Sequence, residues 1–131
     1  MVSKGIGLVM VLLIFGCGSN EMPASSSVML QPADCFGTSE KDVQICLDSV
    51  VNDSRCPTGL QCVWEGDATA AFTLKTSTRR TSFNLHTNSK FQMDTLIDGM
   101  AIALLKITPY PGGQDSIKAS EYRVEIRVTG P

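Results

Sequence analysis

The chain has 131 residues, of which 43% are hydrophobic, and a formal net charge of −2 at pH 7. Its basic residues form no stripe, and Arg79 and Arg80 are the longest basic run, so the charge pattern excludes the usual electrostatic footprint of a nucleic-acid-binding protein. The length indicates a single domain.

Residues 1–16 have the pattern of a secretory signal peptide. Lys4 precedes an apolar run from Gly5 to Gly16, which is shorter than the roughly 20 residues that a transmembrane helix needs. The following motif, Ile14-Phe15-Gly16-Cys17, resembles the bacterial lipobox. This resemblance implies cleavage before Cys17 and acylation of Cys17 with fatty acids such as palmitate, since stable anchoring requires more than one acyl chain. The alternative is an ordinary secreted protein with an incidental Cys17.

An acylated Cys17 predicts a lipoprotein of the bacterial cell envelope. Gly18 and Ser19 follow the cysteine without an aspartate, and this favours the outer membrane, with the protein facing the periplasm. Residues 17–27 are small and polar, which predicts a flexible tether. Residues 28–131 remain for a single β domain.

After the signal peptide the apolar residues alternate with period two instead of following a helical period of 3.6. The clearest case is the last predicted strand, in which Val124, Ile126 and Val128 alternate with charged residues. We interpret 100–107, between Gly99 and Pro109, as a fully buried central strand. The pattern predicts an all-β fold, a small antiparallel sandwich or partly open barrel, with strands at 28–30, 43–51, 68–76, 81–85, 100–107 and 122–128.

Four cysteines remain besides Cys17, and an even number in an exported domain predicts disulfides. Three pairings are possible. We favour Cys56 with Cys62, because Pro57-Thr58-Gly59 supplies a turn between them; Cys35 then pairs with Cys46. A zinc site is disfavoured because no Cys-x-x-Cys pair is present, and we expect no metal and no cofactor.

A family resemblance rests on two short motifs. Residues 53–57 read Asp-Ser-Arg-Cys-Pro and residues 62–64 read Cys-Val-Trp. These motifs resemble those of a group of small bacterial lipoproteins of uncharacterised function, and the likeness continues through Gly66, 109–111 and 122–124. Glu65 departs from the small residue usual in the group, and the cysteines at 35 and 46 are not part of its pattern. The resemblance implies a β-rich, exported domain and no particular activity.

Four residues are candidates for partner binding: Arg55, Leu60, Trp64 and Tyr110. A structural role is the favoured interpretation around Arg55, which we expect to stack on Trp64 and to pair with Asp53, while Ser54 bonds to nearby backbone. Tyr110 lies between two prolines, which predicts an exposed aromatic residue in a loop or one that packs on the end of the domain.

The sequence favours a non-enzymatic binding or accessory module, whose partner is an envelope protein or a small ligand. The alternative is an inhibitor of an exported protease that presents Arg55 or Leu60 from the Cys56–Cys62 loop. Catalysis is disfavoured because His86 is the only histidine and no nucleophile motif is present. We interpret the acidic residues near this loop as solvated loop charges: Asp48, Asp53, Glu65 and Asp67.

Overall fold

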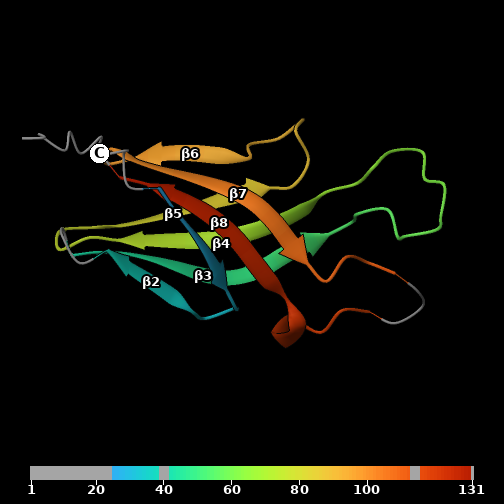
Figure 1. Cartoon of the computed structure of the whole chain (residues 1–131), viewed down its shortest axis with the longest axis horizontal. Coiled ribbons are helices and arrows are strands. Elements are labelled where there is room, and N and C mark those ends of the chain that lie inside the picture. Colours follow the sequence, from blue (N-terminus) through green and yellow to red (C-terminus); the bar gives the residue numbers. More distant parts are fainter. Residues whose placement is uncertain (1–24, 39–41, 113–115, 131) are drawn as a thin grey trace, which may run out of the picture.

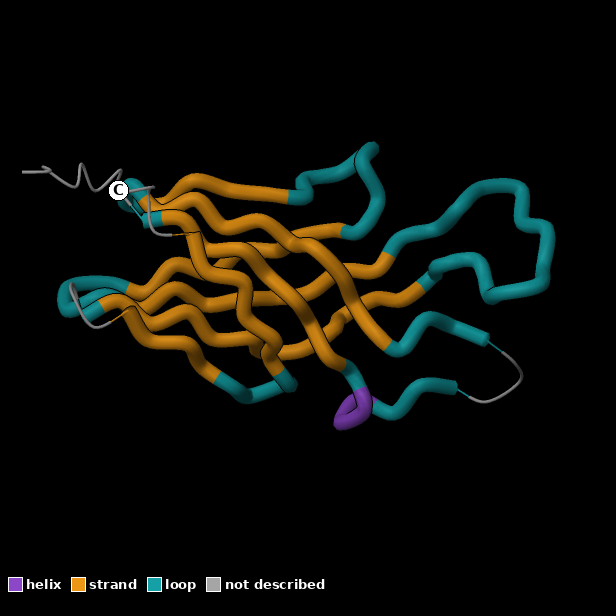
Figure 2. Tube along the Cα trace, viewed as in Figure 1, coloured by secondary structure: helices purple, strands orange, loops and turns teal. Residues whose placement is uncertain are grey.

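The computed structural model describes residues 25–38, 42–112 and 116–130, so the predicted signal peptide and Cys17 lie outside the described residues. The described chain forms an antiparallel β-sandwich of two four-stranded sheets (Figures 1 and 2). The strand orders are β1-β8-β7-β6 and β2-β3-β4-β5. The elements are β1 Ser25–Leu30, β2 Cys35–Thr38, β3 Val43–Asp53, β4 Ala68–Lys75, β5 Arg80–His86, β6 Asp94–Ile97, β7 Met100–Thr108, the 3-10 turn Ala119–Glu121, and β8 Arg123–Thr129.

The core lies between the two sheets, where the inward side chains of both meet. Phe72 and Leu85 of one sheet and Ile102 and Ile126 of the other are all fully buried. The predicted alternation in the last strand is confirmed, since Val124, Ile126 and Val128 are buried while the residues between them are half-buried or exposed. Burial of one face of each sheet is therefore what fixes the register of these strands.

Strand β7 is central in its sheet, as predicted, but it is buried on one face only. Met100, Ile102 and Leu104 point into the core while Ala101 is exposed. A bulge between Leu104 and Lys106 then shifts the alternation so that Ile107 also faces inward. The prediction of a fully buried strand was wrong because no layer of the described chain covers the outer face of this sheet.

The predicted tether overlaps the first strand. Ser25 and Ser27 belong to β1, where they pair with Thr129 and Arg127 of β8. The pairing needs only backbone groups, and the Ser27 hydroxyl also donates a hydrogen bond of 2.8 Å to Glu125. Strand β1 therefore includes the last three residues of the predicted tether, 25–27.

Both favoured disulfides are present. Cys35 and Cys46 face each other across β2 and β3, with Cα atoms 4.0 Å apart. Cys56 and Cys62 are joined outside the sheets, with Cα atoms 5.9 Å apart. The first bridge braces an edge strand and the second closes a loop.

The two ends of the sandwich differ. Ser25, the first residue of β1, pairs with Thr129 at the end where the C-terminus lies (Figure 1). The opposite end carries the long connection between β3 and β4, residues 54–67, which we call the tip loop. In the described part of the chain, no helix is long and apolar enough to cross a bilayer.

Candidate functional site

The base of the tip loop is held by a buried ion pair. Arg55 donates hydrogen bonds of 2.8 Å from Nε and from Nη2 to the two carboxylate oxygens of Asp53. The side chains of Arg55 and Asp53 are only 5% and 11% exposed. The predicted pairing of Arg55 with Asp53 is confirmed, whereas the interpretation of Asp53 as a solvated charge was wrong.

Arg55 also ties the loop to the other sheet. Its Nη1 donates to the carbonyl of Ile107 at 2.6 Å and its Nη2 to the carbonyl of Pro109 at 3.0 Å. The guanidinium lies 4.9 Å from the ring centroid of Tyr110, not on Trp64 as expected. The carbonyls of Ile107, in β7, and of Pro109, just after β7, hold the Arg55 guanidinium beside Tyr110. Arg55 is buried, with only 6% of its surface exposed, so it does not project from the tip loop.

Tyr122, the residue that precedes β8, completes this network. Its hydroxyl donates to Asp53 Oδ2 at 2.9 Å. Burial raises the pKa of the Asp53 carboxyl, but the hydrogen bonds from Arg55 and Tyr122, together with the charge of Arg55, outweigh burial and hold this pKa below its usual value. Burial, the hydrogen bond to Asp53 and the charge of Asp53 raise the pKa of Tyr122 to about 12.

The two ends of the tip loop lie close together at its base. Ser54 donates its backbone N–H to the Asp67 carbonyl at 2.7 Å, and the Ser54 hydroxyl bonds to the same carbonyl at 3.0 Å, as expected for a residue that bonds to nearby backbone. Gly66 has a φ of +75°, and a Cβ there would lie 1.9 Å from the Ser54 carbonyl oxygen. Only glycine fits at this position.

A second buried acid, Asp67, organises the opposite side of the base. Its Oδ2 lies 2.6 Å from Nδ1 of His86 and accepts a hydrogen bond of 3.1 Å from the Thr69 hydroxyl. Its Oδ1 accepts the backbone N–H of Asn88 at 3.0 Å. Burial raises the pKa of the Asp67 carboxyl, but the hydrogen bonds with His86, Asn88 and Thr69 outweigh burial and lower it. Asp67 is 4% exposed, so its interpretation as a solvated charge was wrong.

Sequence reasoning missed this Asp67–His86 pair. His86 lies on β5 beside Thr69 of β4. The signal that could have found the pair is the alternation itself, because it places Thr69 and His86 on the outer faces of successive strands. His86 also contacts the ring of Phe91, with centroids 5.1 Å apart.

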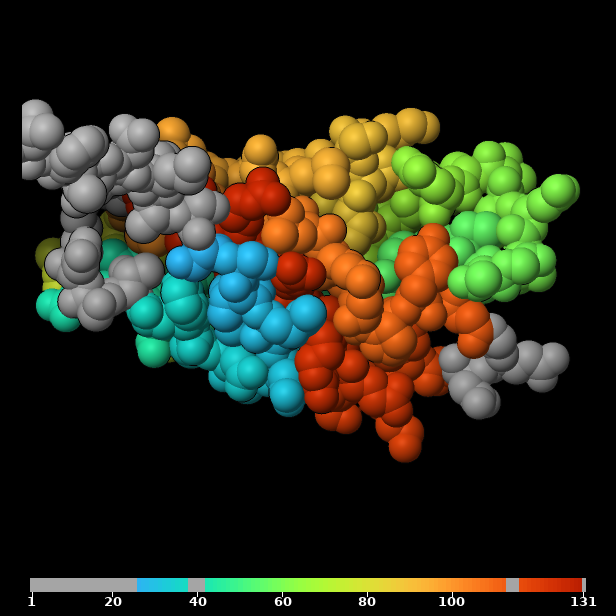
Figure 3. All heavy atoms as spheres, in the orientation of Figure 1, coloured from blue at the N-terminus to red at the C-terminus, as the bar shows by residue number. Residues whose placement is uncertain are grey.

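Above this base, the tip loop exposes apolar side chains. Leu60 is 64% exposed, Val63 is fully exposed, and Trp64 and Tyr110 are about half exposed. We call these four residues the tip patch. Figure 3 shows the tip loop, in green, beside the orange turn that carries Tyr110, and the backbone N–H of Thr58 donates to the Pro111 carbonyl at 2.9 Å. The structure thus brings Leu60, Trp64 and Tyr110 to one end of the molecule.

The disulfide ring within the tip loop is turned, not extended. The backbone N–H of Leu60 donates to the Pro57 carbonyl at 3.2 Å, and Gly59 has a φ of +87°. This is the hydrogen bond of a β-turn. Leu60 therefore projects from a turn that the Cys56–Cys62 bridge closes.

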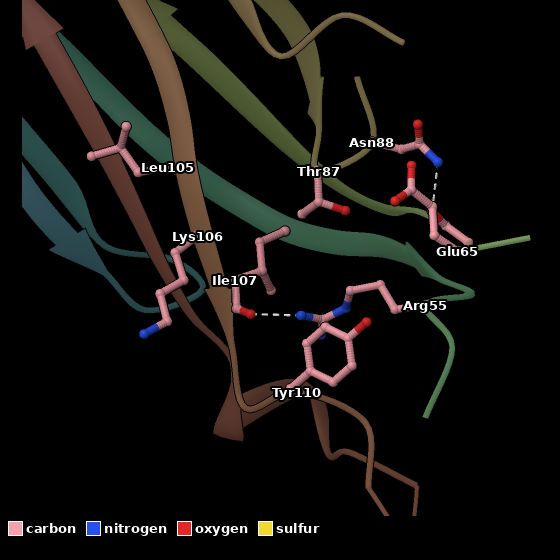
Figure 4. A pocket seen from close by; sticks show the side chains of 9 residues that line it. Arg55, Glu65, Thr87, Asn88, Leu105, Lys106, Ile107 and Tyr110 are labelled. Carbon is pink, nitrogen blue, oxygen red and sulfur yellow. Dashed lines mark hydrogen bonds between the residues drawn. The ribbon is translucent and has the colours of Figure 1, made fainter. Parts of the chain in front are cut away.

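A hollow of about 230 Å³ lies beside the tip patch (Figure 4). It is smaller than the pockets of about 300–1,000 Å³ that hold drug-sized ligands. No set of three potential metal-binding side chains gathers anywhere in residues 25–38, 42–112 and 116–130. The residues that line the hollow are Arg55, Glu65, Gly66, Thr87, Asn88, Leu105, Lys106, Ile107 and Tyr110.

The end of the sandwich therefore combines a rigid polar base with a projecting apolar surface. Comparison with protein-family models, with curated proteins and with solved structures finds no match to this chain.

Proposed function

We propose that this chain is a lipid-anchored lipoprotein of the bacterial envelope, and that it acts as a non-enzymatic module which binds another envelope protein through the tip patch. The observation that carries the proposal is the contrast between the patch and its base. The side chains of Leu60, Val63 and Trp64 are exposed to solvent. At the base of the loop, Arg55 and Asp53 are buried and paired with each other. Clustered exposed apolar residues mark interaction sites.

Rigidity supports binding at this place. Three kinds of contact restrain the tip loop: the hydrogen bonds of Arg55, those between Ser54 and Asp67, and the Cys56–Cys62 disulfide. A preorganised loop loses little conformational entropy when it binds. Tryptophan and tyrosine are also the residue types that contribute most to protein interfaces.

The position of the tip patch supports a partner away from the anchoring membrane. Cys17 precedes Ser25 by a few residues, and Ser25 lies at the end of the sandwich opposite the tip loop. Strand β3 has 11 residues and runs between these two ends, which is on the order of 35 Å at about 3.3 Å per residue. A lipid at Cys17 would thus leave the tip patch facing the periplasm.

Affinity capture from solubilised envelopes tests this function. The intact, detergent-solubilised protein should capture a defined partner in a saturable way, and replacement of Leu60, Val63 and Trp64 with serine should abolish that capture. A matched control replaces three exposed apolar residues elsewhere, Met29, Val51 and Leu96, and should bind normally. Equal capture by both variants would reject the tip patch as the binding surface.

Protease inhibition is the second candidate, and one observation favours it: Leu60 projects from a disulfide-closed ring at the tip of the molecule. The hydrogen bond from Leu60 to Pro57 weighs against it, because substrate-like segments pair with proteases in extended form. If the captured partner is a protease, Leu60→Gly should abolish inhibition of its activity. Unchanged inhibition would reject Leu60 as the presented residue.

A further inference from the structure

The outer face of the sheet β1-β8-β7-β6 carries apolar residues along its central strand β7. From Met100 to Leu105 this strand is apolar on both faces, with Ala101, Ala103 and Leu105 on the outer one. Leu96 of β6, which pairs with Ala101, is 72% exposed there. A strand that is apolar on both faces is typical of a sheet covered on both sides. In the part of the chain that the structure describes, no layer covers this face, so the sequence of β7 indicates a cover from another molecule.

Two unpaired charges of opposite sign flank the alanines on this face. One row across the sheet consists of Asp94 of β6, Ala103 of β7 and Arg127 of β8. Neighbouring strands lie about 4.8 Å apart, so the backbones at Asp94 and Arg127 are about 10 Å apart, with only an alanine between them. Among residues 25–38, 42–112 and 116–130, neither charged side chain has an ion-pair or hydrogen-bond partner. The sheet therefore presents a negative and a positive charge on opposite sides of a floor of small residues.

This row of residues is complementary to itself. A two-fold axis along β7 exchanges the two sides of the row, so that Asp94 of one copy faces Arg127 of the other, and the reverse. A hollow of about 590 Å³ lies over the alanines, and it gives these side chains room to meet across the interface. Farther along β7, Lys106 pairs in the register with Glu125 of β8, so that part of the face has no net charge. A second copy of the chain thus satisfies both unpaired charges at once.

The charges also select the direction of the second copy. A two-fold axis across the strands, through the same row, would place Asp94 against Asp94 and Arg127 against Arg127, and like charges repel. The axis along β7 avoids this and keeps the strands of both copies parallel. Both copies then have Ser25 at one end of the dimer and the tip loop at the other. In this arrangement two lipids at Cys17 enter the same membrane.

We propose that a second copy of this chain covers the outer face of β6, β7 and β8, in a parallel homodimer held by two Asp94–Arg127 ion pairs around the alanines. The four strands span about 19 Å and the seven residues of β8 about 23 Å, which is a small area for a stable interface. Anchoring of both copies in one bilayer compensates, because it raises their effective concentration. The contacts themselves involve neither the lipid nor the tip patch.

Cross-linking in lipid vesicles tests this interface with the intact protein. Ala103→Cys places one thiol beside the two-fold axis, so a short bis-maleimide should join two copies rapidly. Val51→Cys is the matched control, because Val51 is 57% exposed on β3 of the other sheet. It should show only the slow cross-linking of chance collisions. Equal rates at positions 103 and 51 would overturn the inference.

Exchange of the charges tests the ion pairs between the copies. In the Ala103→Cys background, Arg127→Asp and Asp94→Arg each place like charges opposite each other, so each should lower the rate of cross-linking at least about tenfold. When the two variants are mixed, every pair across the interface again has opposite signs. A cross-linked heterodimer, identified by its mass, should then form at the original rate. A mixture without this rescue would overturn the assignment, because a pair within one chain cannot be restored by mixing.

This proposal and the proposed function fail in distinguishable ways. If position 103 does not cross-link while the tip patch still captures a partner, only the homodimer is rejected. If the tip patch captures nothing while position 103 cross-links and mixing restores the charge variants, the homodimer holds and the proposed binding surface is rejected.

Discussion

Replacement of Arg55 with methionine should be far more damaging than its position beside a loop suggests. The change keeps an unbranched side chain of similar reach but removes the guanidinium that holds Asp53 and the carbonyls of Ile107 and Pro109. The Asp53 carboxylate, 11% exposed, would keep only the Tyr122 hydroxyl as a side-chain donor. A buried charge would thus lose its counter-ion.

The expected cost is about 3–5 kcal/mol, the range for breaking a buried ion pair by removing one partner. A surface pair in the same molecule provides the control, because Arg79 and Asp98 also form an ion pair but are 58% and 38% exposed. Arg79→Met should therefore cost about 0–1 kcal/mol. The double variant Asp53→Leu with Arg55→Met should be less destabilised than Arg55→Met alone, since no charge is left unpaired.

Urea unfolding under non-reducing conditions measures these differences in the free energy of unfolding. With a total stability of about 5–15 kcal/mol expected for a domain, the Arg55→Met variant should fold but unfold at a clearly lower urea concentration. A cost for Arg55→Met no larger than that for Arg79→Met would refute the structural role of the buried pair.

Gly66→Ala should lower the free energy of unfolding by several kcal/mol, because the new Cβ meets the Ser54 carbonyl. Gly59→Ala has nothing within 4 Å of its new Cβ, so it should lose only the roughly 1–2 kcal/mol that a positive φ costs. Equal losses of stability in urea unfolding would contradict this difference. The pKa values of Asp53 and Asp67 are lowered in the folded state, so their contribution to stability is complete above the ordinary value of 3.8. This contribution should be lost as the pH falls through the folded-state pKa values, and a free energy of unfolding that rises on acidification would contradict the prediction. The raised pKa of Tyr122 gives the opposite sign: its contribution to stability is complete below pH 10 and is lost as the pH rises toward about 12. In an absorbance titration, the tyrosine signal that appears near pH 12 should vanish in Tyr122→Phe and remain in Tyr110→Phe. Replacing Cys56 and Cys62 with serine should lower stability by about 2–3 kcal/mol and leave the sandwich folded, which circular dichroism checks; loss of all strand signal would show that the bridge holds more than the loop.

The period-two alternation predicted most strands because burial of one sheet face leaves a direct mark on the sequence. Strand β6 was missed, since Asp94–Ile97 is short and half exposed. A signal for it existed, because Asp98 and Gly99 form a two-residue hairpin turn with positive φ values between Ile97 and Met100. Strand β2 was missed as well, and its only sequence signal was the cysteine that faces Cys46.

The site was predictable only as far as its contacts are local. Asp53 and Arg55 are two residues apart, so their pairing could be expected from the motif. The contacts of Arg55 with Ile107, Pro109 and Tyr110 depend on how two different sheets meet, and no alternation pattern encodes that. The burial of Asp67 against His86 could not be predicted either, because it depends on a contact between residues that are distant in the sequence.

Site-specific photo-crosslinking in living cells tests whether the tip patch binds a partner in the envelope. A photoreactive residue at position 60 should form one discrete cross-link with an envelope protein, which disappears when Trp64 is replaced with serine. The same residue at exposed position 84 on β5 should form none. Identical patterns at positions 60 and 84, or no cross-link at position 60, would show that the tip patch is not the binding surface.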